Sequence, residues 1–242
     1  MNLTLASIFK AVLQISLLAL TAGTAIAQDV VTLKVHHFLP PSSTAHAKFI
    51  VPWCDKIAKE SNNRMKCQIY PAMQLGGTPA QLFDQAKDGV ADIIWTVPGY
   101  QAGRFTVSEA FELPFIVTST EKGSRALWHY ATKNAMQEFK GVKPILFHLH
   151  DGNLLHTARK QIKSLEDFRG AKVRAATRQS TKMLTALGAT PVPMPLPQTP
   201  ESLAKGVIDG ALIPWEVSPA LKLEEIAQFH TELDPSSGQI SN

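Results

Sequence analysis

The chain has 242 residues, of which 45% are hydrophobic and 18% are charged, and its formal net charge at pH 7 is +4. These values are ordinary for a globular protein. The basic residues are scattered along the chain, which argues against nucleic-acid binding because that function needs a concentrated basic face. The mild positive balance slightly favours an anionic over a cationic ligand.

The first 27 residues have the pattern of a secretory signal peptide. Lys10 is their only charged residue, residues 11–22 are rich in Leu and Ala, and Ala25-Ile26-Ala27 is a small-x-small cleavage pattern. A membrane anchor is the alternative, but the apolar run is shorter than the roughly 20 residues that span a bilayer. We therefore expect a cleaved signal over residues 1–27, a mature chain that begins near Gln28, and a periplasmic location.

The chain contains two cysteines, Cys54 and Cys67. In an exported protein two cysteines more often pair than stay free. Cys54 lies in a predicted helix and Cys67 in the strand that follows, and a helix that folds back on its own strand can bring them together. We expect a disulfide; the alternative is two small buried hydrophobic side chains.

Strand and helix patterns alternate along the rest of the chain. Up to residue 150 the pattern predicts strands at 31–36, 65–70, 91–97 and 144–149 and helices at 44–59, 79–87 and 121–139. Beyond residue 150 it predicts strands at 172–176 and 211–213, a short helix after Ser164, a helix at 180–187, a helix opened by Thr199-Pro200 and a helix at 218–228. Residues 191–200 contain five prolines and are expected to form an extended linker. Such alternation favours parallel sheets with helices on both faces.

One pattern occurs twice. Residues 87–98 read KDGVADIIWTVP and residues 205–214 read KGVIDGALIP, and each follows a helix opened by Thr-Pro. One interpretation is that both stretches simply have the common pattern of a helix end, a glycine turn and a strand. The other is a pair of similar α/β lobes whose strand ends face each other across a ligand cleft.

Two groups of residues offer other chemistry. Ser202 and Lys205 match the S-x-x-K of serine acyl-transferases, but the S-D-N and K-T-G elements of those enzymes do not occur. His148 and His150 share a face of a predicted strand, beside Asp151, and a metal site would need one or two further ligands; His36 and His37 could supply them only if the fold brings them near.

Five stretches in a fixed order carry a resemblance to a known family. They are Tyr70–Gly76 (YPAMQLG), Ala110–Phe115 (AFELPF), Phe168–Arg174 (FRGAKVR), Leu187–Pro195 (LGATPVPMP) and Gly206–Gly210 (GVIDG). Together they resemble the DctP-type solute-binding proteins of tripartite ATP-independent periplasmic (TRAP) transporters, and the likeness runs from about Thr32 to Phe229.

The resemblance implies an α/β, two-lobe fold like that of type II periplasmic binding proteins, with a ligand cleft between the lobes. On this basis residues 28–150 form lobe I, residues 151–216 form part of lobe II, and residues 217–242 begin the connecting segment. Family members typically continue for tens of residues, so the fold is expected to be C-terminally incomplete. The implied partners are a small organic acid and the TRAP membrane permease subunits. No catalysis, cofactor, metal or nucleic acid is implied, and we expect a monomer.

The family holds its organic acid with an arginine in the strand that corresponds to residues 172–176, and the matching residue is Arg174. A guanidinium group matches a carboxylate in two parallel hydrogen bonds. Many members carry a second arginine where this chain has Leu154, and Gln-Glu-Asn where it has Ala211-Leu212-Ile213. The expected ligand-binding residues are Arg174, His37, Phe38, Trp95, Thr96, Trp215 and Glu216.

These departures replace polar contacts by apolar ones and leave one cationic anchor. The favoured ligand is therefore a monocarboxylate with an apolar or aromatic body. A metal or metal-chelate binding protein that uses His148 and His150, a hydrolase that uses Ser202 and Lys205, and a non-functional fragment of a solute receptor stay open as alternatives.

Overall fold

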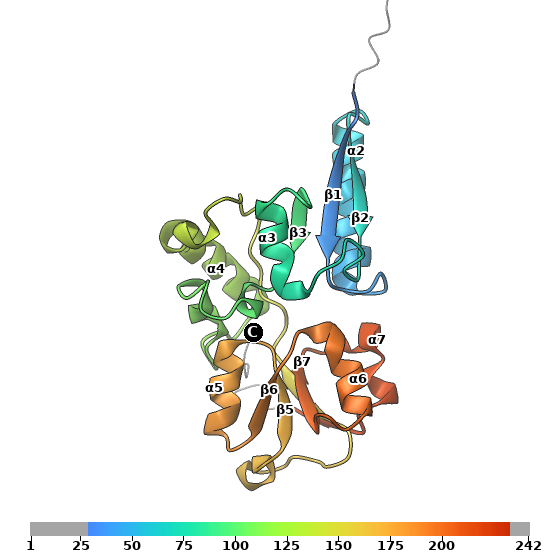
Figure 1. The fold of residues 1–242 in the computed structure, drawn as a ribbon. Coiled ribbons are helices and arrows are strands. Elements are labelled where there is room, and N and C mark those ends of the chain that lie inside the picture. The colour runs from blue at the N-terminus through green and yellow to red at the C-terminus, as the bar shows by residue number, and fades with distance from the viewer. Residues whose placement is uncertain (1–28, 233–242) are drawn as a thin grey trace, which may run out of the picture.

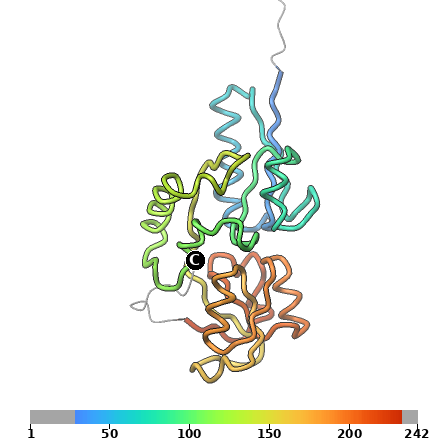
Figure 2. The backbone as a smooth tube through the Cα atoms, turned by 60° about the vertical axis from the view of Figure 1, so that its left-hand side comes forward, coloured from blue at the N-terminus to red at the C-terminus, as the bar shows by residue number. Residues whose placement is uncertain are grey.

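A computed structural model describes residues 29–232, whose strands form two sheets (Figure 1). We call residues 31–150 the N-terminal region and residues 151–232 the C-terminal region, because each contains one of the sheets. Figure 2 shows the two regions as separate bodies, blue to green and orange to red, that meet along one side. Residues 1–28, with the predicted signal, lie outside the described residues. No helix among residues 29–232 is both long enough and apolar enough to cross a membrane.

The N-terminal sheet has three parallel strands in the order β2-β1-β3. They are β1 (Val31–His37), β2 (Met65–Tyr70) and β3 (Ile93–Trp95). A π-helical turn (Ala45–Ile50) and α2 (Val51–Glu60) connect β1 to β2, and α3 (Leu82–Lys87) precedes β3. The carboxyl end of β1 points toward the C-terminal region (Figure 1).

A disulfide between Cys54 and Cys67 ties α2 to β2, as the sequence predicts. Cys54 packs with Val35 and Ile50 in a small apolar cluster between the helix and the sheet. The crosslink and this cluster together fix α2 on its own strand.

A second apolar cluster lies beneath α4 (Thr120–Asn134). Ser119 caps this helix, because its hydroxyl accepts a hydrogen bond from the backbone N–H of Lys122. The helix buries Leu127 and Ala131 against three phenylalanines, Phe83, Phe105 and Phe139. This cluster supports the irregular segments 96–119 and 140–153, which carry the side chains that face the C-terminal region.

The C-terminal sheet has five strands in the order β6-β5-β7-β4-β8. They are β4 (Leu154–Thr157), β5 (Lys172–Ala175), β6 (Thr190–Pro193), β7 (Gly210–Ile213) and β8 (Phe229–Thr231). β5 is parallel to both of its neighbours, whereas β4 is antiparallel to β7 and β8. The helices of this region are α5 (Arg178–Ala186), α6 (Thr199–Ala204) and α7 (Ser218–Leu221). All four residues of β7 are buried, so this strand is the centre of the sheet.

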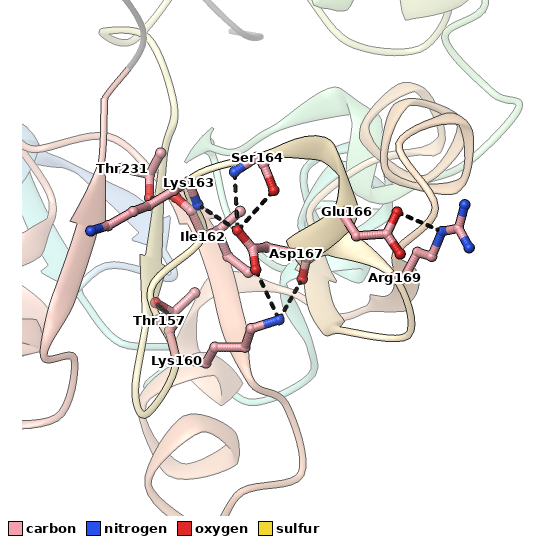
Figure 3. Close-up of polar contacts among 9 residues, drawn as sticks. All are labelled: Thr157, Lys160, Ile162, Lys163, Ser164, Glu166, Asp167, Arg169 and Thr231. Atoms are coloured by element: carbon pink, nitrogen blue, oxygen red, sulfur yellow. Dashed lines mark hydrogen bonds and ion pairs between the residues drawn. The ribbon is translucent and has the colours of Figure 1, made fainter.

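The loop between β4 and β5 is held by one carboxylate, that of Asp167 (Figure 3). Its Oδ2 accepts hydrogen bonds from the backbone N–H groups of Lys163 and Ser164, each at 3.1 Å, and from the Ser164 hydroxyl at 3.0 Å. Its Oδ1 lies 3.2 Å from the Lys160 ammonium. These bonds, led by that from Lys163, lower the pKa of Asp167 to about 2. Ser164 and Asp167 therefore form a capping box at the start of the short helix that the sequence predicts after Ser164.

The structure confirms the predicted α/β class and corrects several elements. Residues 144–149 do not form a strand but line a cavity. The helix predicted at 218–228 breaks at Lys222, which has a left-handed backbone with φ of 53°. The proline-rich segment contains β6, which tolerates Pro191 and Pro193 because it is an edge strand and its prolines need not donate to a ladder on both sides. The domain bounds proposed from the resemblance stay predictions.

The two regions share one apolar core. Phe38, Leu39 and Leu82 from the N-terminal region belong to the same buried cluster as residues of the C-terminal region, namely Met194, Leu196, Leu203, Ile208, Ala211, Ile213, Leu223 and Ala227. The regions are therefore packed against each other, and their contact surface is where the predicted cleft would close.

Candidate functional site

Arg174 lies on β5 and is buried, with 3% of its surface exposed. The strand has a neighbour on each side, and both supply acceptors for the guanidinium. Its Nε donates to the carbonyl oxygen of Met194 at 3.1 Å, and its Nη1 donates to that of Leu212 at 2.9 Å. The sheet thus fixes the orientation of the cation with backbone groups.

None of the ion pairs formed by the described residues includes Arg174. Burial lowers the pKa of Arg174, and its interaction with the Tyr100 hydroxyl opposes that shift. A buried charge that no opposite charge balances costs several kcal/mol. An anion bound beside Arg174 would offset this cost, so the arrangement is chemically suited to a carboxylate.

Tyr100 reaches Arg174 from the N-terminal region. It ends a 3₁₀ turn (Pro98–Tyr100) that follows β3, and its hydroxyl accepts a hydrogen bond from the backbone N–H of Leu196 at 3.2 Å. The same hydroxyl lies close enough to the Arg174 guanidinium for each group to shift the pKa of the other. Tyr100 therefore joins the two regions at the cation. Sequence reasoning missed this residue, although its place just after a strand end in a Pro-Gly-Tyr turn is a signal that could have identified it.

Aromatic rings continue from Tyr100 into the N-terminal region. The Phe38 ring lies 5.4 Å from that of Tyr100 and 5.5 Å from that of Trp95, centroid to centroid. Trp95 stacks on His148 at 5.6 Å and donates from its indole Nε1 to the His148 Nε2 at 3.0 Å. The structure thus brings together three of the predicted site residues, Arg174, Phe38 and Trp95, through Tyr100.

His150 lies in the segment that connects the two sheets. Burial lowers the pKa of His150, and the positive charge of Arg174 acts in the same direction. Its Nδ1 lies 2.5 Å from the Asp151 carbonyl oxygen, which can only accept, so Nδ1 carries the proton. A neutral imidazole adds no second positive charge to the site.

The other predicted site residues have different surroundings. His37 is buried, and its Nδ1 accepts from the Leu39 N–H, so its Nε2 donates to the Nδ1 of His46 at 2.9 Å. Burial lowers the pKa of His37 to about 4. Thr96 donates to the Pro79 carbonyl at 3.4 Å. These two side chains hold the turns that follow β1 and β3.

Trp215 and Glu216 are exposed and follow β7. The Trp215 ring packs against His156 and His230 at 5.0 and 4.9 Å, and its Nε1 donates to Glu232. These contacts are within the C-terminal region, whereas Phe38 and Trp95 reach the centre from the other side.

Two glutamates add a second contact between the regions. Glu109 is buried and forms an ion pair with Arg178 at 2.5 Å, at the first residue of α5. Glu112 lies beside it and bonds to Thr177, but its Oε2 is buried without a hydrogen-bond partner. Burial raises the pKa of Glu112 to about 7, and the charge of Glu109 adds to the shift. A Cβ at Gly99 would clash with both Glu112 and Thr177, so the glycine permits this close approach.

A cavity of about 630 Å³ lies within the N-terminal region rather than over Arg174. Its walls are mostly apolar and include β3 and residues 141–150. Trp95, His148 and His150 belong to its lining, so this cavity shares Trp95 and His148 with the row of aromatic rings. We take Arg174 and its aromatic neighbours as the candidate site because Arg174 is buried, whereas Lys143, the cation in the cavity lining, is exposed to solvent.

The alternative chemistries find little support in the geometry. Within residues 29–232, no group of three or more His, Cys, Asp or Glu side chains is placed to hold a metal ion. The Lys205 ammonium pairs with Glu201 one turn away on α6 rather than with Ser202. The His148 Nε2 accepts a hydrogen bond from the Trp95 indole, so this nitrogen is not free to bind a metal ion.

The solved structures that are similar to this chain include the following three. A TRAP solute-binding protein from Rhodoferax ferrireducens, in complex with copurified benzoate, is 52% identical with a TM-score of 0.86. One from a marine metagenome, specific for aromatic acid ligands and bound to 3-hydroxybenzoate, is 48% identical with a TM-score of 0.85. One from Bordetella bronchiseptica, with bound (R)- and (S)-mandelate, is 30% identical with a TM-score of 0.80. These matches cover 87–88% of this chain and 66% of each solved chain.

The comparisons confirm both the resemblance drawn from the five sequence stretches and the two-lobe fold that it implies. The model of the DctP family, described as bacterial extracellular solute-binding protein family 7, matches residues 35–235. That match includes the C-terminal sheet, most of the N-terminal sheet and every residue of the candidate site. The chain therefore belongs to the DctP family of bacterial extracellular solute-binding proteins.

Proposed function

We propose that this chain is the periplasmic solute-binding component of a TRAP transporter and that it captures an aromatic monocarboxylate. The observation that carries the proposal is the buried Arg174 guanidinium, which has no ion-pair partner among the described residues and lies at the end of a row of aromatic rings. Proteins that share 48–52% of its sequence hold benzoate and 3-hydroxybenzoate. The captured acid would then be handed to the membrane permease subunits.

The energetics favour a ligand with one charge and an apolar body. A hydrogen bond to a charged group contributes about 1.5–3 kcal/mol, whereas micromolar affinity requires roughly 8 kcal/mol. Burial of a ring against Phe38 and Trp95 would supply much of the difference, at roughly 25 cal/mol per Å² before ordering costs are subtracted. A second carboxylate would lack a cationic partner, since Leu154 stands on β4 where many family members carry an arginine.

The role is capture rather than conversion. A group that holds a carboxylate by two parallel hydrogen bonds binds it without activating it. The two sides of the candidate site come from different regions of the chain. A bound ligand would therefore favour the closed arrangement of the two regions, as in other two-lobe receptors.

A thermal-shift screen tests the proposal. The chain is heated with benzoate, 3-hydroxybenzoate, mandelate, succinate, Zn²⁺ or Ni²⁺, each at saturating concentration. We expect the aromatic monocarboxylates to raise the melting temperature most, because a ligand that binds only the folded state stabilises it by mass action. Stabilisation by the metals alone would contradict the proposal, and so would the absence of any shift with all of the acids.

A further inference from the structure

Tyr100 stands at the boundary between the two regions, beside the proposed carboxylate anchor. It is the last residue of the turn that follows β3, and its hydroxyl contacts two groups of the C-terminal region, the Leu196 N–H and the Arg174 guanidinium. Its ring packs edge-on against Phe38. The same side chain therefore touches the cation, the aromatic cluster and both regions.

The chemistry of the hydroxyl leaves its proton available. A tyrosine hydroxyl has one donor and two acceptor positions. A backbone N–H and a guanidinium are donors only, so Leu196 occupies one acceptor position and the nearby Arg174 cannot accept the hydroxyl proton. None of the hydrogen bonds among the described residues uses the Tyr100 proton. Burial raises the pKa of Tyr100, so the hydroxyl keeps this proton at neutral pH.

We infer that the Tyr100 hydroxyl donates a hydrogen bond to the same ligand carboxylate that Arg174 binds, and so selects for a carboxylate from the opposite region. This inference rests on the proposed function and adds a second binding residue to it. A carboxylate can accept from both groups because it has about four lone-pair sites. The hydroxyl adds a hydrogen bond without adding charge, which suits a single negative charge held by a single arginine.

The arrangement also connects binding with closure. Arg174 belongs to the C-terminal sheet and Tyr100 to the N-terminal region, so a carboxylate held by both bridges them. The bond from Leu196 to the Tyr100 oxygen orients the phenol before the ligand arrives. Pre-oriented donors lose little freedom on binding and therefore contribute more to affinity.

Calorimetry on Tyr100→Phe tests the inference. The substitution removes the hydroxyl and keeps the ring against Phe38. We expect the benzoate affinity to fall about tenfold or more, since a lost hydrogen bond to a charged group has an effect of that size. Tyr130→Phe is the matched control, because its ring packs against Phe111 beside α4; it should bind benzoate as the wild-type chain does. A wild-type chain that binds benzoate and a Tyr100→Phe variant within twofold of it would overturn the inference.

A fluorinated tyrosine separates donation to the ligand from a merely structural role. Fluorine on the phenol makes the hydroxyl a stronger donor and a weaker acceptor. If Tyr100 donates to the ligand, site-specific 3-fluorotyrosine at this position should bind benzoate more tightly below the pH at which it ionises. Weaker binding would mean that the hydroxyl acts only as an acceptor, and would contradict the inference. Failure of the wild-type chain to bind any aromatic acid would instead refute the proposed function.

Discussion

The two regions hold their ligand-facing groups in different ways. In the C-terminal region, Arg174 lies on a strand with a neighbour on each side, and backbone carbonyls from both sides fix its guanidinium. In the N-terminal region, Phe38 and Tyr100 lie just after strand ends, and His148 lies in an irregular segment. On the proposed function, the charged group of the ligand would therefore be held by a rigid sheet and its apolar body by residues on turns. Charged contacts need exact geometry and apolar contacts tolerate adjustment, so this division suits a receptor for one carboxylate with a variable body.

Replacement of Arg174, the proposed carboxylate anchor, should have the largest effect on ligand binding. We expect Arg174→Met to lower benzoate affinity by ten- to several-hundredfold, with Arg174→Lys between it and the wild-type chain because an ammonium keeps the charge but not the planar fork. Titration calorimetry measures both. Arg169→Met is the control, since that arginine is exposed and pairs only with Glu166 on the surface. If Arg174→Met loses less than tenfold, the anchor is misassigned.

The family resemblance, the residue type and a place near the end of a strand together indicated Arg174 as the carboxylate anchor, and this role stays a prediction. The sequence predicted the Cys54–Cys67 pair because both elements are local and strongly patterned. Tyr100 was not predicted, since its role depends on a contact with Leu196 that spans 96 positions. The failure at residues 144–149 has the same origin: the pattern shows strand propensity, but no strand among the described residues pairs with this segment.

Loss of the disulfide should weaken one region and spare the other. Cys54 and Cys67 are 13 positions apart, within the N-terminal region. For a loop of this size the entropy model gives about 3 kcal/mol of stability. We expect the Cys54→Ser, Cys67→Ser double variant to unfold its N-terminal region at lower denaturant, as read by the fluorescence of Trp53. Hydrogen exchange of β5 and β7 should stay slow; equal loss of protection in both sheets would show that the regions unfold as one unit.

The contact between the regions should depend on pH through Glu112. The pKa of this carboxyl rises from 4.5 to about 7 in the folded chain, so between these values the folded state holds a proton that the unfolded state lacks. Its contribution to stability is complete below pH 4.5 and is lost as the pH rises through 7. We expect Glu112→Gln to remove a decline on the order of 3 kcal/mol over this window.

The quantity to measure is the difference in unfolding free energy between Glu112→Gln and the wild-type chain at each pH. His37 has a lowered pKa of about 4, so it changes stability in the opposite direction at acid pH, and it does so equally in both proteins. Glu109 and Arg178 face Glu112 and remain charged in both. Parallel stability curves for Glu112→Gln and wild type between pH 5 and pH 8 would contradict the assignment.

The loop before β5 should show the smallest effect. Asp167 has a pKa lowered to about 2 by hydrogen bonds that begin with Lys163. Its stabilisation is present above its ordinary pKa of 3.8 and is lost as the pH falls through 2. Because the carboxylate is exposed to solvent, we expect Asp167→Asn to lower the melting temperature only slightly at pH 7. The difference from wild type should shrink below pH 4, and a difference that grows there would be inconsistent with this role.

The central claim is that one buried arginine and a row of aromatic rings select an aromatic monocarboxylate. Titration of the wild-type chain with benzoate and with succinate under identical conditions tests it most directly. Benzoate places one charge on Arg174 and a ring against Phe38 and Trp95, whereas succinate brings a second charge and no ring. We predict that benzoate binds at least tenfold more tightly; tighter binding of succinate would contradict the account.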